Sequence, residues 1–161
     1  MVQLFPEDAK LAPVMGILRR LSHTKRMISL AELSALSHHR MDLLLPQMNA
    51  ARIMGLIEIK DSHVMLTPLG GKFYLNDQRA KDEVAKRLET LEPFMAASEL
   101  VKRKRIFTAG ELATQLERDG LSWHTDYVKN RALLNSVLIQ WAIYLDILDY
   151  NGKSKRWLKH E

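Results

Sequence analysis

Residues 140–158 read QWAIYLDILDYNGKSKRWL, and they predict the end of a helix, a strand, a tight turn and a second strand. Asn151-Gly152 separates two runs with alternating apolar residues, LDILDY and SKRWL. Asn-Gly in this setting is the strongest short-range hairpin signal, because both central residues of a type I′ turn need a positive φ. The stretch therefore predicts a helix followed directly by a β-hairpin with a two-residue turn.

The same order of elements is predicted twice along the 161 residues. Each copy has an apolar-striped helix, a short apolar run, a short helix, a longer helix and a hairpin. In the first copy, the first helix is residues 7–21, the short apolar run is ISL and the short helix is AELSALS. The longer helix is residues 40–54, ended by Gly55, and the hairpin strands are LIEIK and HVMLT around Asp61-Ser62. In the second copy, a helix ending in KRKR is followed by the run IFT, the short helix AGELATQLERDG, the longer helix HTDYVKNRALLNSVLIQWAIY and the quoted hairpin. This order is that of a winged helix-turn-helix.

A long charged segment connects the two copies. TPLGGKFYLND predicts a short helix with Thr67 as N-cap and Pro68 at its first position. Residues 78–103 predict a bridging helix, which Pro93 kinks or interrupts. We predict a mainly α fold with small β-hairpins (α+β), organised as tandem winged helix-turn-helix modules. Residues 1–77 form the first module, 78–103 the bridging helix, and 104–161 the second module, whose first helix the bridging helix supplies.

Composition narrows the function classes. The chain is 47% hydrophobic and 27% charged, which is an ordinary globular balance. It has no cysteine, which excludes disulfides and thiolate chemistry. The first residues do not form a signal peptide, and no apolar stretch approaches the roughly 18 to 20 residues of a membrane span. We expect a cytoplasmic protein without membrane insertion. The net charge of +5 permits contact with nucleic acid without requiring it.

Motifs for catalysis or phosphate binding are absent from the sequence. In GGKFY, Phe73 stands where a phosphate-binding loop needs a hydroxyl, and Leu66 stands where it needs a glycine. No G-x-S-x-G motif or Cys-His pairing is present. Asp146 and Asp149 are three residues apart on a predicted strand, so they are expected on opposite faces and not as an acid–base pair. We predict a non-enzyme with no catalytic residues and no cofactor.

A metal site is not expected either. His38 and His39 are adjacent, and Asp42 follows within one helical turn of both. At best one histidine shares a face with Asp42, which gives two ligands where a zinc site needs three or four. We interpret the two histidines as solvated loop residues.

The third helix of the first module is a poor candidate for reading DNA bases. Counting back from Gly55, the core-facing positions are Leu44, Met48 and Ala51. The outward positions are mostly acidic or apolar, and such residues repel phosphate or read little beyond a thymine methyl; they are Asp42, Leu43, Leu45, Pro46 and Asn49. Leu43, Leu45 and Pro46 are therefore candidates for contact with a protein partner. The alternative is that they pack against the bridging helix of the same chain.

The hairpin of the second module is the other candidate surface, through Asn151, Gly152 and Trp157. A DNA-binding regulator remains an alternative for the whole chain, and its candidates are Arg40, Gln47 and Asn49 in the first module and Lys129, Asn130, Lys153, Lys155 and Arg156 in the second. The simpler interpretation is that these charged residues form a solvent-exposed surface that binds no partner. Tyr150 and Trp157 are expected to close the core. A weaker hypothesis is a small-ligand sensor with Trp123, Tyr127 or Trp141 around a pocket.

Three stretches resemble the AAA-associated C-terminal domain family: DLLLPQMNAARIMGLIEI, VMLTPLGGKF and QWAIYLDILDYNGKSKRWL. They match its D-L-L-P run, its L-T-P-x-G-x-x-F segment and its terminal W-(G/A)-x-Y-x-(E/D)-(I/L)-(L/F)-x-Y hairpin. The matching positions here are Asp42, Leu43, Leu44, Pro46, Leu66, Thr67, Pro68, Gly70, Phe73, Trp141, Ala142, Tyr144, Asp146 and Tyr150. The departures are the extra Leu45 before the proline, and Ala142 where glycine is common. The resemblance extends from about Leu30 to Leu158.

This family is best known as the tail of ATP-binding subunits of nitrate/sulfonate/bicarbonate-type ABC transporters. The resemblance implies a free-standing version of that tail, with an accessory or regulatory role and no catalytic residues to carry over. We expect a non-enzymatic winged-helix protein that acts through protein contacts, with an ABC transporter ATP-binding subunit or a second copy of itself (a homodimer) as partner. The alternative is a DNA-binding transcriptional regulator.

Overall fold

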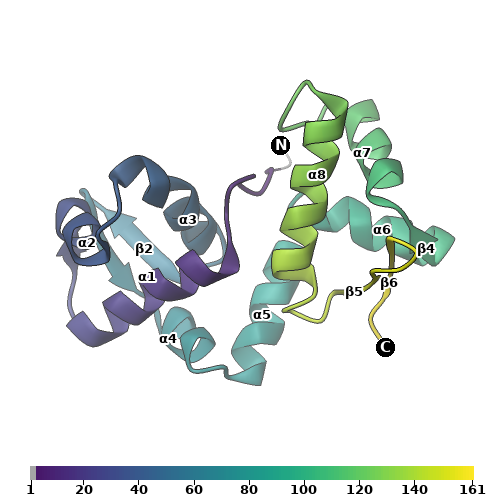
Figure 1. Cartoon of the computed structure of the whole chain (residues 1–161). Coiled ribbons are helices and arrows are strands. Elements are labelled where there is room, and N and C mark those ends of the chain that lie inside the picture. The colour runs from purple at the N-terminus through teal and green to yellow at the C-terminus, as the bar shows by residue number, and fades with distance from the viewer. Residues whose placement is uncertain (1–2) are drawn as a thin grey trace. The chain divides into compact units, whose positions relative to one another are not determined.

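The computed structural model describes residues 3–161, so the first two residues of the predicted first module lie outside the described part. The chain is mainly helical with two small antiparallel sheets (Figure 1), which confirms the predicted α+β class. Contacts divide it into two compact units. The first unit is Asp8–Val84. The second unit combines residues 3–7 with Ala85–Glu161.

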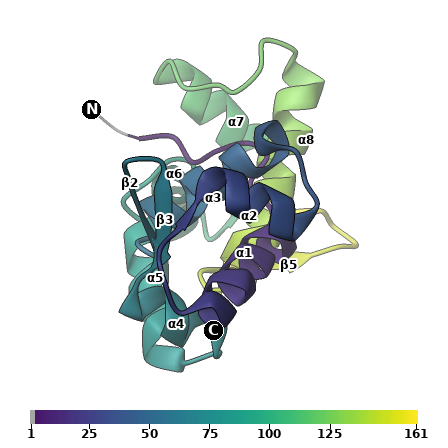
Figure 2. The same ribbon diagram turned by 90° about the vertical axis from the view of Figure 1, so that its left-hand side faces the viewer.

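The first unit contains the elements predicted for the first module, in the predicted order. They are α1 (Leu11–Thr24), β1 (Ile28–Ser29), α2 (Leu30–Ser37), α3 (Met41–Ile53), β2 (Ile57–Lys60), β3 (His63–Leu66) and α4 (Pro68–Tyr74). The unit also takes in most of α5 (Gln78–Leu88), which was predicted as part of the bridging helix. Figure 2 shows this unit from another side, with a short turn between α2 and α3. Asp61 and Ser62 both have positive φ and close the turn between β2 and β3, as a two-residue hairpin requires.

The sheet of the first unit has the strand order β1-β3-β2. Val64 lies in the central strand and pairs with Ile28 on one side and Ile59 on the other. Val64 and Ile28 are buried together with Leu18 of α1 and Met48 of α3. The helices and the sheet therefore share one apolar core.

The second unit repeats this order after an interruption in the predicted bridging helix. Pro93 interrupts that helix, as expected, so α5 and α6 are separate. The further elements are α6 (Phe94–Lys104), β4 (Ile106–Phe107), α7 (Ala109–Arg118), α8 (Tyr127–Val137), the π-helical segment η1 (Leu138–Ala142), β5 (Leu148–Asn151) and β6 (Arg156–Lys159). The third helix predicted for this module is thus an α-helix that continues as π-helix.

The second sheet has the same arrangement as the first, with strand order β4-β6-β5. Trp157 occupies the central strand, where it pairs with Phe107 and Tyr150. Trp157 is fully buried, and its ring lies 4.6 Å from that of Tyr150. Its indole Nε1 donates a hydrogen bond of 3.0 Å to Asn135 Oδ1. Trp157 therefore closes the core, as predicted.

The predicted two-residue turn at Asn151-Gly152 is wrong. Asn151 pairs with Arg156 as the last rung of the hairpin, so four residues form the loop. Asn151 Oδ1 instead accepts hydrogen bonds from the backbone N–H groups of Lys153 and Ser154, at 3.0 and 3.2 Å. Lys155 takes the positive φ, of 55°. An Asn side chain that binds the backbone two residues on is a common alternative to a type I′ turn.

The two units also begin their second helix in the same way. Ser29 caps α2 by accepting from Glu32 N–H, and Thr108 caps α7 by accepting from Glu111 N–H. Each of these glutamates pairs with a cation near the end of the preceding helix. Arg26 lies 2.5 Å from Glu32, and Lys104 bonds Glu111. The hydrogen bond from each cation lowers the pKa of the glutamate that accepts it.

Adjacent glycines in α4 have different roles. Thr67 caps this helix by accepting from Gly70 N–H at 2.9 Å, and its hydroxyl donates to Gly55 O. A Cβ at Gly70 would lie 2.0 Å from the backbone oxygen of Leu56, whereas a Cβ at Gly71 would lie 3.7 Å from its nearest neighbour. The close approach of α4 to the chain at Leu56 therefore requires glycine at only one of the two positions.

This difference gives a matched pair of substitutions. Gly70→Ala forces a backbone shift and is expected to lower the free energy of unfolding by about 3 kcal/mol or more. Gly71→Ala replaces a helical glycine whose added Cβ would make only ordinary contact, and it is expected to raise the free energy of unfolding by roughly 0.5 to 1 kcal/mol. Urea denaturation followed by circular dichroism measures both. Equal effects of the two substitutions would contradict the close approach.

Candidate interaction sites

The outward face of α3 is apolar and exposed. Leu43 is 59% exposed and Leu45 45%, while Pro46 is half-buried. Leu44 and Met48 point into the core, as predicted. The buried side of α3 is formed by residues at helical spacing, including Leu44, Met48 and Ala51, so Leu43 and Leu45 lie on the side that faces the solvent. We name Leu43, Leu45 and Pro46 the α3 face.

The polar residues predicted on α3 do not all face outward. Gln47 is buried, which corrects its place among the DNA-binding candidates. Its Oε1 accepts from Lys10 N–H and its Nε2 donates to Asp8 O, both at 2.8 Å. Its amide satisfies two backbone groups that precede α1. Arg40 and Asn49 are exposed.

The second unit carries a hollow of about 460 Å³ between α8, the start of α7 and the β5–β6 hairpin. Arg131 and Lys155 are its two charged lining residues, and no carboxylate lines it; the others are Thr108, Ala109, Gly110, Val128, Ala132, Asn135, Tyr150 and Ser154. The lining is therefore positively charged. We name it the basic hollow.

Arg131 was missed as a site residue by sequence reasoning. Its guanidinium lies 5.5 Å from the centre of the Tyr127 ring, a cation–π distance. A Cβ at Gly110 would come within 3.2 Å of the Tyr127 hydroxyl, so the small residue leaves room for this pair. The signal in the sequence was the spacing of four residues between an aromatic residue and an arginine on one helix.

The other candidates of the second unit divide by exposure. Asn151 and Gly152 are exposed, as are Lys129, Lys153, Lys155 and Arg156. Asn130 is buried, and its Oδ1 accepts from Trp123 N–H at 3.1 Å. Asn130 and the buried Trp157 are therefore corrected from contact candidates to structural residues, because both are buried and hydrogen-bond within the unit through Asn130 Oδ1 and Trp157 Nε1.

Residues 3–7, which we name the arm, dock into the second unit. Phe5 is fully buried, and its ring makes edge-to-face contacts with Phe94 and Trp141 at 5.3 and 5.6 Å. Trp123 Nε1 donates to Phe5 O at 2.9 Å. Such aromatic pairs contribute about 0.5 to 1.5 kcal/mol beyond area burial.

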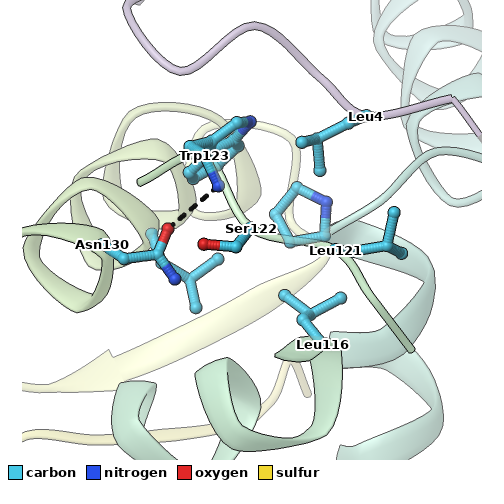
Figure 3. Close-up of a pocket in the computed structure, with 8 residues that line it drawn as sticks. Leu4, Leu116, Leu121, Ser122, Trp123 and Asn130 are labelled. Carbon is cyan, nitrogen blue, oxygen red and sulfur yellow. Dashed lines mark hydrogen bonds between the residues drawn. The ribbon is translucent and has the colours of Figure 1, made fainter. Parts of the chain in front are cut away.

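The backbone of the arm pairs with the segment before α6. Leu4 and Glu92 form a parallel β-bridge. Glu92 N–H donates to Gln3 O at 3.0 Å, and Phe5 N–H donates to Glu92 O at 2.7 Å. Beside them lies a cavity of about 10 Å³, bordered by Leu4, Pro93, Leu116, Leu121, Ser122, Trp123, Asn130 and Leu134 (Figure 3). That volume is at the lower limit for one water molecule.

The aromatic residues considered for a ligand pocket have separate surroundings. Trp123 borders the small cavity, Tyr127 lies under Arg131, and Trp141 is fully buried against Phe5. The hypothesis of a pocket lined by them therefore gains no support from their placement.

Asp146 and Asp149 converge, contrary to expectation. Asp146 precedes β5 with a φ of 56°, so the alternation of a strand does not apply to it. His160 Nδ1 lies 2.9 Å from Asp149 Oδ1, and His160 Nε2 lies 4.0 Å from Asp146 Oδ1. The hydrogen bond to Asp149 raises the pKa of His160. All three side chains lie at the surface.

Within residues 3–161, no group of three or more His, Asp or Glu side chains could hold a metal ion. No helix in the same range is long and apolar enough to cross a membrane.

The model of the C-terminal AAA-associated domain family matches residues 31–151, which is 121 of the 161 residues. The chain belongs to this family. Comparisons with curated proteins and with solved structures gave no match. The match confirms the resemblance, and the AAA-associated domain suggests association with ABC or AAA proteins.

The motif residues of this AAA-associated domain have structural roles. Thr67 and Pro68 begin α4, and Gly70 permits its close approach to Leu56. Trp141 is fully buried in the second unit. Four motif residues are exposed instead: Asp42 and Leu43 of the D-L-L-P run, Pro68 and Asp146. Among these, Leu43 is a large apolar side chain, and it belongs to the α3 face.

Glu92 gives this AAA-associated domain a pH dependence. Its side chain is buried at the start of α6, and Oε1 accepts from Ala96 N–H at 3.0 Å. Burial raises its pKa, and the nearby charges of Glu99 and Asp119 add to the rise. Protonated Glu92 is therefore favoured in the folded chain relative to the unfolded chain, where a glutamate has a pKa of about 4.3. The contribution of Glu92 to the free energy of unfolding is fully present below that pH and is lost as pH rises through the folded pKa.

Glu92→Gln keeps the acceptor and removes the charge. We expect the variant to match the wild type below about pH 4 and to exceed its free energy of unfolding at neutral pH. Denaturant titrations at several pH values measure the difference. The exposed Glu89→Gln removes the same charge from the surface and is the matched control, measured at the same pH values. A constant difference for Glu92→Gln would contradict the burial of a charge.

Proposed function

We propose that this chain is a cytoplasmic, non-enzymatic accessory protein that binds an ABC transporter ATP-binding subunit. The proposal treats each unit as a winged helix-turn-helix module, with α3 and α8 as the third helices. Family membership supports the class of partner. The order of elements and the shared strand order of the two sheets support the modules.

The observation that carries this proposal is the α3 face. In a winged helix-turn-helix this helix offers its N-terminal part to the major groove of DNA. Here that part presents Leu43 and Leu45, both about half exposed, and the acid Asp42. Apolar side chains in contact with water favour burial against another protein, whereas they contribute little to binding phosphate or bases. The surface therefore suits a protein partner.

The polar groups of both units support a role without catalysis. Gln47 and Asn130 are buried, and each has backbone partners within its own unit. Asp146, Asp149 and His160 lie at the surface rather than in a cleft. Gln47 and Asn130 thereby hold the segments that precede α1 and α8. A general acid or base instead needs a substrate position within hydrogen-bond reach.

Substitution of the α3 face tests the proposal. Leu43→Asp with Leu45→Asp places two charges on the surface and is expected to abolish capture of a purified transporter ATP-binding subunit in a pull-down, while the circular dichroism spectrum stays unchanged. The loss should be at least tenfold in affinity, because charges at the centre of an apolar interface remain unpaired. Leu75→Asp is the matched control, since Leu75 is 76% exposed and lies on α4's C-terminal side.

Capture that survives the double substitution would reject the α3 face as the docking site. Unfolding of the double variant would instead favour internal packing of the two leucines.

A second candidate function is DNA binding through the second unit. The observation that favours it is the basic hollow, where Arg131 and Lys155 lie between α8 and the hairpin. Lys153 and Arg156 are exposed beside it. Cations between a third helix and a wing suit contact with phosphates.

Fluorescence anisotropy of a labelled random duplex, titrated at about 50 and 200 mM salt, tests this candidate. If six or more phosphate contacts form, affinity should fall by roughly a thousandfold or more between the two salts. Arg131→Ala with Lys155→Ala should weaken binding and reduce the salt dependence. Lys60→Ala with Lys72→Ala removes the same charge from the first unit and should have little effect. Absence of binding at the lower salt would reject the candidate.

A further inference from the structure

The arm contacts Glu92, Phe94, Trp123 and Trp141 of the second unit in the way a bound peptide would, and we name these four residues the groove. The arm forms a single parallel β-bridge with Glu92, through the backbone of Gln3 and Phe5, and the Phe5 ring packs against Phe94 and Trp141. Strand addition with a side-chain anchor is a general mode of peptide recognition. The groove thus reads a short extended segment with an aromatic residue, here in the order Leu4-Phe5-Pro6.

The hydrogen bonds and aromatic contacts that join the arm to the groove involve residues 3–5. Two backbone hydrogen bonds to Glu92, the bond from Trp123 to Phe5 O and the burial of the Phe5 ring account for them. None of these contacts depends on the residues that follow the arm. The same segment supplied by another chain would make the same contacts, so its exchange loses none of them.

The joint that follows these contacts carries an unsatisfied group. Glu7 is the last residue of the arm, and the first unit begins at Asp8. Glu7 Oε2 is buried without a hydrogen-bond partner among the described residues. A buried carboxylate oxygen without a partner destabilises the arrangement that contains it. The closed chain therefore has a defect at the joint that an opened joint can relieve by hydration.

We propose that the groove on the second unit is a peptide-binding site that the arm of a second copy of this chain can occupy, giving an arm-exchanged dimer. The site is distinct from the α3 face and does not rest on the transporter proposal. A tethered segment has an effective concentration in the millimolar range. The closed monomer should therefore dominate at micromolar protein and the dimer should accumulate toward about 1 mM.

Mass measurement is the first test, and it uses the full chain with Leu43→Asp and Leu45→Asp, so that the α3 face cannot contribute. Light scattering should give the monomer mass of 18.6 kDa at about 10 μM and a mass approaching twice that at about 1 mM. Phe5→Ala should abolish the dimer, and Trp123→Phe, which keeps an aromatic ring but removes the donor to Phe5 O, should weaken it. Glu7→Ala removes the carboxylate oxygen Oε2 that lacks a partner in the closed joint and should also reduce dimer formation.

Cross-linking is the second test, and the absence of native cysteine makes it specific. One chain carries Leu4→Cys and the other Glu92→Cys, the two positions that face each other across the β-bridge. Oxidation of a concentrated mixture should give a covalent heterodimer on a non-reducing gel. A mixture of Leu4→Cys with Leu75→Cys is the matched control and should give none above background.

Two results would overturn the proposal. One is a monomer mass at all concentrations, and the other is a dimer that persists in Phe5→Ala. If Glu92→Cys fails to fold, the mass measurement decides alone, because it leaves Glu92 unchanged. Either negative result leaves capture of the transporter subunit by the α3 face unaffected, so the two proposals fail separately.

Discussion

Burial of Phe5 against Phe94 and Trp141 is the contact on which the division of the chain depends. It fixes residues 3–7 in the second unit, although the first unit begins at the next residue. The chain therefore belongs to the second unit, then the first, then the second again. Burial of the whole Phe5 ring contributes more to the stability of the docked arm than the few backbone hydrogen bonds beside it.

Both units are stabilised by the same three structural features. A capped second helix, a glutamate paired with a preceding cation and a three-stranded sheet recur in each. The sizes of the central side chains differ: Val64 is central in one sheet and Trp157 in the other. The larger ring needs a partner for its N–H, which Asn135 supplies. Similar architecture therefore coexists with little sequence identity, because packing constrains shape and polarity more than residue identity.

The third helices of the two units offer different chemistry to a partner. The α3 face presents two leucines, while α8 presents Arg131 beside a basic hairpin. One surface favours burial against an apolar partner, and the other favours an anion. Proteins with repeated modules can divide their contacts in this way, since fold alone does not determine function.

Much of this architecture followed from the sequence by itself. Apolar periodicity predicted the helices and strands, Thr67 and Pro68 predicted the start of α4, and the spacing from Gly55 predicted which leucines of α3 are buried. These features depend on neighbours within a few residues, which a sequence displays directly. The family motifs could be recognised for the same reason, because each consists of residues that are close together in the sequence.

Tertiary structure alone decided the rest. Gln47 looked exposed but is buried, because residues 37 and 39 positions away supply its partners. Asp146 and Asp149 meet at His160 because a positive φ breaks the alternation before β5. The hairpin loop has four residues because the Asn151 side chain bonds the backbone within the loop. Phe5 finds Trp123 118 residues away. Local patterns do not encode such distant partners or competing hydrogen bonds, since both depend on the folded chain bringing the groups together.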